Sequence, residues 1–197
     1  MQLEHRVREA FSSITQLLAK FREEQTEKLT AAARMLAGTF REGNKVLLFG
    51  NGGSAADAQH LAAEFVNRFQ VERPPLAAMA LTTDTSILTA VGNDYDFQDI
   101  FVKQIMALGR KGDVAWGIST SGSSPNVVKG LEAAKAQGLS TLAVTGRDGG
   151  KMAPLADICL NVPSHDTPRV QEVQITIGHI LCDLVDFLLF PNQFNQP

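Results

Sequence analysis

Two pairs of side chains have the residue types and spacing for metal binding or proton transfer. His60 and Glu64 stand four residues apart, which places them on one face of a helix about one turn apart. Gln171 and His179 lie about two turns apart and about 80° apart around a helix axis, so both can face one cleft. Structural interpretations stay open for both pairs. The first can be a solvated ion pair, and His179 can be a core histidine bonded to a backbone carbonyl.

Two loops rich in glycine or serine have the features of anion sites. Residues 50–54 (GNGGS) join an apolar run to a helical segment, whose first N–H groups and dipole favour an anion. This loop is not a dinucleotide fingerprint, because Ala55 stands where a glycine is needed, and it lacks the lysine of a Walker A loop. Residues 119–124 (STSGSS) place five hydroxyl groups before Pro125, a residue favoured at the first position of a helix. A tight turn and a polar surface loop are the structural alternatives.

Together these groups suit the interconversion of an aldose and a ketose phosphate. That reaction needs an anchor for the phosphate, a base that removes a proton beside the carbonyl, and an acid that moves protons between oxygens. Glu64 can be the base and His179 the acid. A metal ion bound by His60, Glu64, Gln171 and His179 is a further possibility, and these nitrogen and oxygen donors suit zinc among other divalent ions.

The elements that must position these groups alternate along the chain between strand and helix. The apolar runs at 45–49, 76–81, 114–118, 141–144 and 158–162 predict buried strands. The segments between and after them predict helices at 54–69, around 87–91, at 97–108, from 125 and from 168 to about 190. Apolar strands alternating with helices indicate a doubly wound, five-stranded parallel sheet, which binds ligands beyond the carboxyl ends of its strands.

Three local details of these helices can be predicted as well. Residues 3–41 have apolar positions at helical spacing, as one long helix or as two helices with a break near 21–25. Ser54 is a candidate N-cap, with Asp57 three residues later as in a capping box. We expect residues 92–94 (GND) to interrupt the helical segment between 87 and 108.

The bulk composition limits the possible partners. The 197 residues carry a net charge of −3, so there is no electrostatic basis for binding nucleic acid or anionic lipid. The two cysteines lie far apart and form no CxxC motif, which fits a reducing compartment. No signal peptide and no apolar run long enough to span a membrane are apparent. We therefore expect a cytoplasmic protein with one domain.

The order of the short motifs resembles that of the phosphoheptose isomerases, a family of sugar isomerase (SIS) domains. The first block is residues 50–54 with Asp57, His60 and Glu64. The further blocks follow in the family's order, at 91–94 (VGND), 117–122 (GISTSG), 142–152 (LAVTGRDGGKM) and 169–172 (RVQE). Each block is weak alone, but the set covers nearly the whole chain.

The resemblance implies a flavodoxin-like sheet in a single SIS domain, residues 1–197, with residues 1–42 forming oligomerisation helices. It implies a homotetramer with shared active sites that converts sedoheptulose 7-phosphate to D-glycero-D-manno-heptose 7-phosphate, the first step towards the ADP-heptose of lipopolysaccharide. Glu64 matches the family's base and His179 its acid, and one zinc ion per subunit is held by positions matching His60, Glu64, Gln171 and His179. Substrate contacts match Asn51, Gly52, Gly53, Glu64, Asn93, Asp94, Ser119, Thr120, Ser121, Ser124 and Gln171.

Other stretches resemble a second SIS-domain family, the proteins that associate with the replication initiator DnaA. These stretches are residues 67–69 with 72–74, 163–165, and 181–186 with 189–191. The known members of that family lack the acid and the histidine that match Glu64 and His179. A non-catalytic protein that binds DnaA is therefore the alternative to the isomerase, and a SIS domain acting on another sugar phosphate is a third interpretation.

Overall fold

The computed structural model describes residues 2–194 and confirms the predicted parallel sheet. Its five strands pair in the order β2-β1-β3-β4-β5, and every neighbouring pair is parallel. The strands are β1 (Val46–Gly50), β2 (Ala78–Ala80), β3 (Val114–Ser119), β4 (Ser140–Gly146) and β5 (Ile158–Val162). The α-helices are α1 (Gln2–Arg41), α2 (Gly53–Val66), α3 (Thr85–Asp94), α4 (Ile100–Leu108), α5 (Pro125–Ala136) and α6 (Thr167–Leu189), and short 3₁₀ turns span Phe97–Asp99 and Pro191–Gln193.

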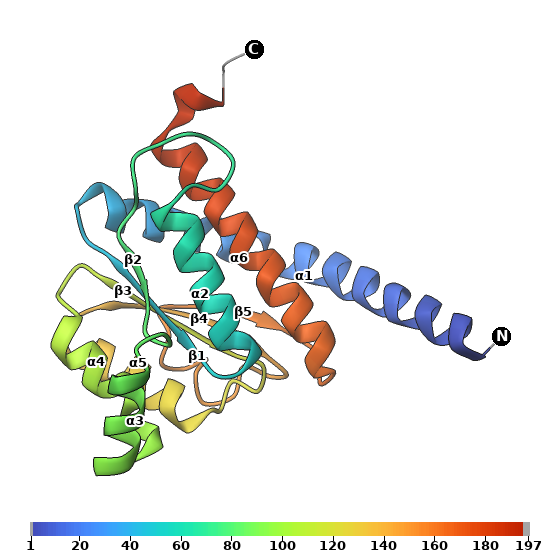
Figure 1. Ribbon diagram of the computed structural model, residues 1–197. Helices are drawn as coiled ribbons and strands as arrows, with labels where there is room; N and C mark the ends of the chain where they lie inside the picture. Colours follow the sequence, from blue (N-terminus) through green and yellow to red (C-terminus); the bar gives the residue numbers. More distant parts are fainter. Residues whose placement is uncertain (1, 195–197) are drawn as a thin grey trace.

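Helices cover both faces of the sheet, which explains why the strands are apolar throughout. In β1, Val46 and Leu48 join the core formed with α1, α2 and α6, whereas Leu47 and Phe49 join the core formed with α4 and α5. All four side chains are fully buried. Figure 1 shows α2 and α6 side by side on one face and α3, α4 and α5 on the other. Alternate residues of one short strand therefore support two separate cores.

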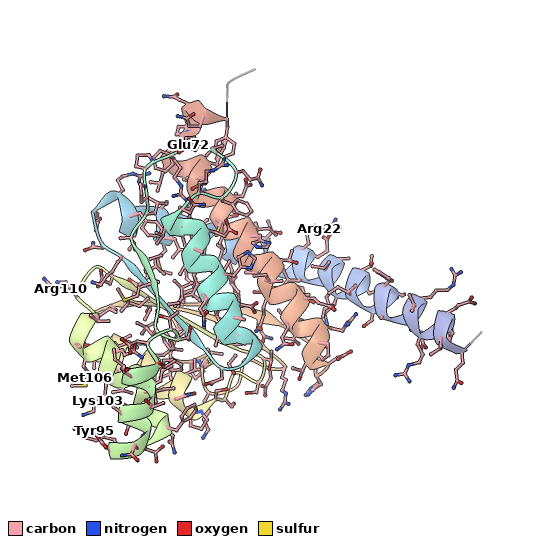
Figure 2. The ribbon with its side chains drawn as sticks, viewed as in Figure 1. Arg22, Glu72, Tyr95, Lys103, Met106 and Arg110 are labelled. Atoms are coloured by element: carbon pink, nitrogen blue, oxygen red, sulfur yellow. The ribbon has the colours of Figure 1, made fainter. Side chains whose placement is uncertain are left out.

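Helix α1 is one continuous helix, so the possible break near 21–25 is absent. From Phe21 onward, residues such as Phe21, Leu29 and Leu36 are buried, and this part of the helix packs against α6 and β5. Its first half is exposed, including Leu3, Val7 and Phe11. Figure 1 shows the N-terminal part of this helix extending past the rest of the chain, and Figure 2 shows side chains all around that part.

Two of the predicted local details were wrong. Gly52, not Ser54, is the N-cap of α2, and the cap has no side-chain hydrogen bond. Ser54 is instead buried in the first turn. The chain turns into the helix one residue before Gly53, at Gly52, which has a φ of 55°. The predicted division into two helices is confirmed, but the break comes after Asp94 rather than at residues 92–94, because α3 continues to Asp94 and a single glycine inside a helix carries only a modest cost. The chain leaves the helix at Tyr95.

Within residues 2–194, no helix is both long enough and apolar enough to cross a membrane.

Candidate active site

The two predicted pairs meet on neighbouring helices. His60 and Glu64 lie on α2, with His60 Nε2 3.0 Å from Glu64 Oε1. His179 of α6 brings its Nε2 to 3.4 Å from His60 Nε2. The donor atoms of the three residues all lie within 4.8 Å of one another. We call His60, Glu64 and His179 the histidine–glutamate cluster. Two imidazoles and one carboxylate converging in this way form a donor set that fits a zinc ion.

The surroundings of His179 favour its neutral form. Burial lowers the pKa of His179, the nearby His60 lowers it further, and the Glu64 carboxylate acts in the opposite direction. Phe69 stacks on the imidazole, with ring centroids 5.6 Å apart and planes 29° apart. The neutral form is the one that can bind a metal or accept a proton.

Gln171 lies two turns before His179 and, in this structure, beside the first loop rather than in the cluster. A Cβ atom on Gly53 would come within 2.5 Å of Gln171 Nε2, so the absence of a side chain there makes room for the amide. Gly53, Asp57 and Gln171 line one shallow pocket of about 300 Å³. Burial raises the pKa of Asp57 in this pocket, and His60 opposes that effect. Gln171 as a metal ligand stays a prediction.

The first loop is held at the carboxyl end of β1 by a pair of amides. Asn51 Nδ2 donates to Asn126 Oδ1 and Asn126 Nδ2 donates to Asn51 Oδ1, both at 2.8 Å. Asn126 is buried in the first turn of α5, so the bond ties the two loops together. Asn51 and Gly52 also line a pocket of about 160 Å³ with Thr82 and Leu88.

The serine loop lies at the carboxyl end of β3, where the sequence places it. The Ser119 hydroxyl is 2.9 Å from the Ser124 hydroxyl and 3.3 Å from that of Ser121. Ser124 is the N-cap of α5 and its side chain makes no capping bond. Pro125 has no N–H, and the Val127 N–H donates to the Ser124 carbonyl at 3.1 Å, so the Asn126 N–H is the first-turn donor that can bind an anion. The segment after β4 supports this loop, because the Met152 N–H donates to the carbonyl of Gly122 at 2.9 Å.

The chain therefore carries two groups of predicted site residues that do not touch. The two loops share the carboxyl edge of the sheet, but Glu64 lies eleven residues along α2 from Gly53, about 16 Å at 1.5 Å per residue. Gln171 lies at the loop end of α6 and His179 at the cluster end. Asn93 Nδ2 lies 2.7 Å from Asp94 Oδ1, and no side-chain hydrogen bond or ion pair among the described residues joins either residue to the loops or to the cluster.

Two residues that support the site were not expected from the sequence. Asn126 is an asparagine in the first turn of a helix, which is a common position with no special signal. Phe69 was noted only within a stretch resembling the DnaA-associating proteins. Neither contact has a signal in the local sequence, because both depend on packing between segments that are distant along the chain.

Comparison with known proteins places this chain in a family. Residues 10–146 match the model of the SIS domain. The phosphoheptose isomerase of Nitratidesulfovibrio vulgaris Hildenborough is 59% identical over 178 residues, which are 90% of this chain and 86% of that protein. The solved phosphoheptose isomerase of Neisseria gonorrhoeae is 45% identical with a TM-score of 0.89, over 93% of this chain and 98% of that one. The solved phosphoheptose isomerase of Francisella tularensis is 38% identical with a TM-score of 0.91, and the match covers 94% of this chain and 99% of that one.

The chain therefore belongs to the phosphoheptose isomerase family of SIS-domain proteins.

Proposed function

We propose that this protein is a cytoplasmic isomerase that converts sedoheptulose 7-phosphate to D-glycero-D-manno-heptose 7-phosphate, the first step towards ADP-heptose for lipopolysaccharide. The observation that carries the proposal is the convergence of His60, Glu64 and His179 from two helices. The relatives named above as phosphoheptose isomerases support the same activity. They also favour it over the DnaA-binding alternative.

The two loops supply the phosphate anchor. The hydroxyl groups of Ser119, Ser121 and Ser124 lie close together at the end of β3, where the N-terminal dipole of α5 also favours an anion. Together with Thr120 and the backbone of residues 51–53, they can hold a phosphate without a lysine or an arginine. Asn93 and Asp94 remain predicted substrate contacts.

The histidine–glutamate cluster supplies the proton transfers. The Glu64 carboxylate removes the proton from C1 of the ketose and returns it to C2, while His179 moves a proton between the oxygens on C1 and C2. His60 lies against both groups and holds them in position. A zinc ion held by His60, Glu64 and His179, with Gln171 as the fourth ligand, would polarise the carbonyl and hydroxyl oxygens of the sugar.

We further propose a homotetramer with active sites shared between subunits. Two observations support it: the exposed apolar residues on the first half of α1, and the separation of the loops from the histidine–glutamate cluster within one chain. A second copy can bring the phosphate anchor of one chain to the cluster of another.

The test is turnover of sedoheptulose 7-phosphate with and without added zinc, in the wild type, Glu64→Gln and His179→Ala. We expect each substitution to lower kcat by at least about 100-fold, as for loss of a general acid or base. His5 and Glu9 form a similar i,i+4 pair on the exposed part of α1, so His5→Ala and Glu9→Gln serve as matched controls that should keep their activity.

Absence of turnover in folded, zinc-supplied wild-type protein would contradict the proposal. A pull-down with DnaA would then test the binding-protein alternative.

A further inference from the structure

A buried arginine connects the two helices that carry the histidine–glutamate cluster. Arg73 lies in the segment after α2, and its side chain is fully buried. Its Nε donates to Asp186 Oδ1 of α6 at 2.9 Å. Asp186 is also buried, with 1% of its side chain exposed. A guanidinium and a carboxylate both removed from water depend strongly on each other.

The same guanidinium binds the last turn of α2 through its other donors. Nη2 donates to the carbonyl of Glu64 at 2.8 Å, and Nη1 donates to the carbonyl of Phe65 at 2.6 Å. Nη1 also lies 3.2 Å from the carbonyl of Asn67. Carbonyls at the end of a helix lack partners within the helix, and a cation there is favoured by the helix dipole. Arg73 therefore fixes the main chain of Glu64 itself.

Asp186 lies on the same face of α6 as His179. It stands seven residues after His179, which is about two turns along the helix and within about 20° around its axis. Both residues therefore belong to the face of α6 that packs against α2. The Arg73–Asp186 pair thus joins the backbone of Glu64 to the helix that carries His179.

We propose that Arg73 and Asp186 are positioning residues that hold Glu64 and His179 at their reactive separation. This inference rests on the proposed roles of Glu64 and His179 in catalysis. A change in the spacing of two catalytic groups lowers the rate of the chemical step without weakening the anchoring of the phosphate, which lies on other loops.

The experiment compares kcat, KM and the urea midpoint of Asp186→Ala with those of the wild type. We expect kcat to fall at least about 10-fold while KM changes less than about 3-fold. Asp186→Asn keeps an oxygen that can accept the Arg73 Nε–H, so it should recover most of the lost kcat. Arg73→Lys loses the guanidinium, whose Nε, Nη1 and Nη2 donate to Asp186 and to the end of α2, and should reproduce the fall in kcat. It is the second probe if Asp186→Ala does not fold.

Asp113 provides the matched control for loss of stability. Its carboxylate is also buried, and it accepts from the Lys45 and Arg110 backbone N–H groups and pairs with the Lys45 ammonium, with no partner on α2 or α6 among the described residues. Asp113→Ala should lower the urea midpoint yet keep kcat near the wild-type value.

Wild-type kcat in a folded Asp186→Ala and Arg73→Lys would overturn the positioning role. If the folded, zinc-supplied wild type shows no turnover, the proposed function fails, and if Glu64→Gln and His179→Ala keep full activity, their catalytic roles fail. Both results are distinguishable from a failure of the positioning role alone.

Discussion

His179 shows how neighbouring groups decide what one side chain can do. Burial and the adjacent His60 lower its pKa from the ordinary 6.5, and the Glu64 carboxylate opposes them only in part. A neutral imidazole at neutral pH can accept the proton that it later donates as an acid. The proposed roles of Glu64 and His179 therefore depend on their being close neighbours.

The lowered pKa predicts how the stability of the metal-free protein varies with pH. Below about pH 6.5 the unfolded chain protonates this histidine while the folded chain does not, so stability is lost as pH falls through the lower, folded pKa. Between about pH 7.5 and about pH 5.5, the urea midpoint should therefore fall more in the wild type than in His179→Gln. Equal decreases in the two proteins would contradict the prediction.

At the scale of elements, the serine loop depends on one backbone conformation. Gly122 has a φ of 63°, and a Cβ there would collide with the carbonyl of Gly149. The loop and the segment behind it therefore fit together only without a side chain at this position.

Gly122→Ala should destabilise the protein by about 1–3 kcal/mol and raise KM, because the loop must move to relieve the strain. Gly38→Ala is the control: a Cβ at this helical position meets nothing within 4 Å, so the substitution should stabilise by about 0.5–1 kcal/mol. Urea unfolding and steady-state kinetics of both variants test the pair. A Gly122→Ala protein with unchanged stability and KM would show that the loop is more adaptable than its geometry indicates.

The sheet could be predicted from the sequence because its signals are local. Apolar runs such as residues 45–49 and 114–118, each followed by a glycine or serine loop, indicate buried parallel strands and the edge where a ligand binds. The pairing of His60 with Glu64 was also local, because it follows from helical spacing.

The remaining features depend on contacts between distant segments. The approach of His179 to His60 spans 119 positions, and the Arg73–Asp186 bond spans 113. No spacing rule within one helix predicts either distance. The start of α2 at Gly53 rather than at a capping serine was missed for a different reason, since the backbone at Gly52 replaces the side-chain cap.

At the scale of the whole molecule, helix α1 has more apolar surface than one chain covers. Leu3, Val7 and Phe11 recur at four-residue intervals along its exposed half. A groove of about 390 Å³ between α1 and α6 is lined by side chains such as Leu18, Phe21, Ile177 and Leu184. Apolar surface of this kind marks a site of association.

If the proposed homotetramer forms through this surface, Phe11→Glu should reduce its mass measured by analytical ultracentrifugation. A charge at the centre of an apolar contact loses its hydration without gaining a partner. Ser13→Glu places the same charge on another face of α1 and should leave the mass unchanged. An unchanged mass in Phe11→Glu would place the contact between subunits elsewhere.

The length of α1 has a consequence for how the protein behaves on dilution. Its 40 residues extend about 60 Å, and its exposed half has little tertiary support within the chain beyond contacts such as that of Arg169 with the Ala10 carbonyl, so another copy covering it would stabilise it. Folding of that half and association are then one equilibrium governed by mass action. Its melting temperature would rise with protein concentration, and a dilute sample would lose helical signal before the sheet unfolds.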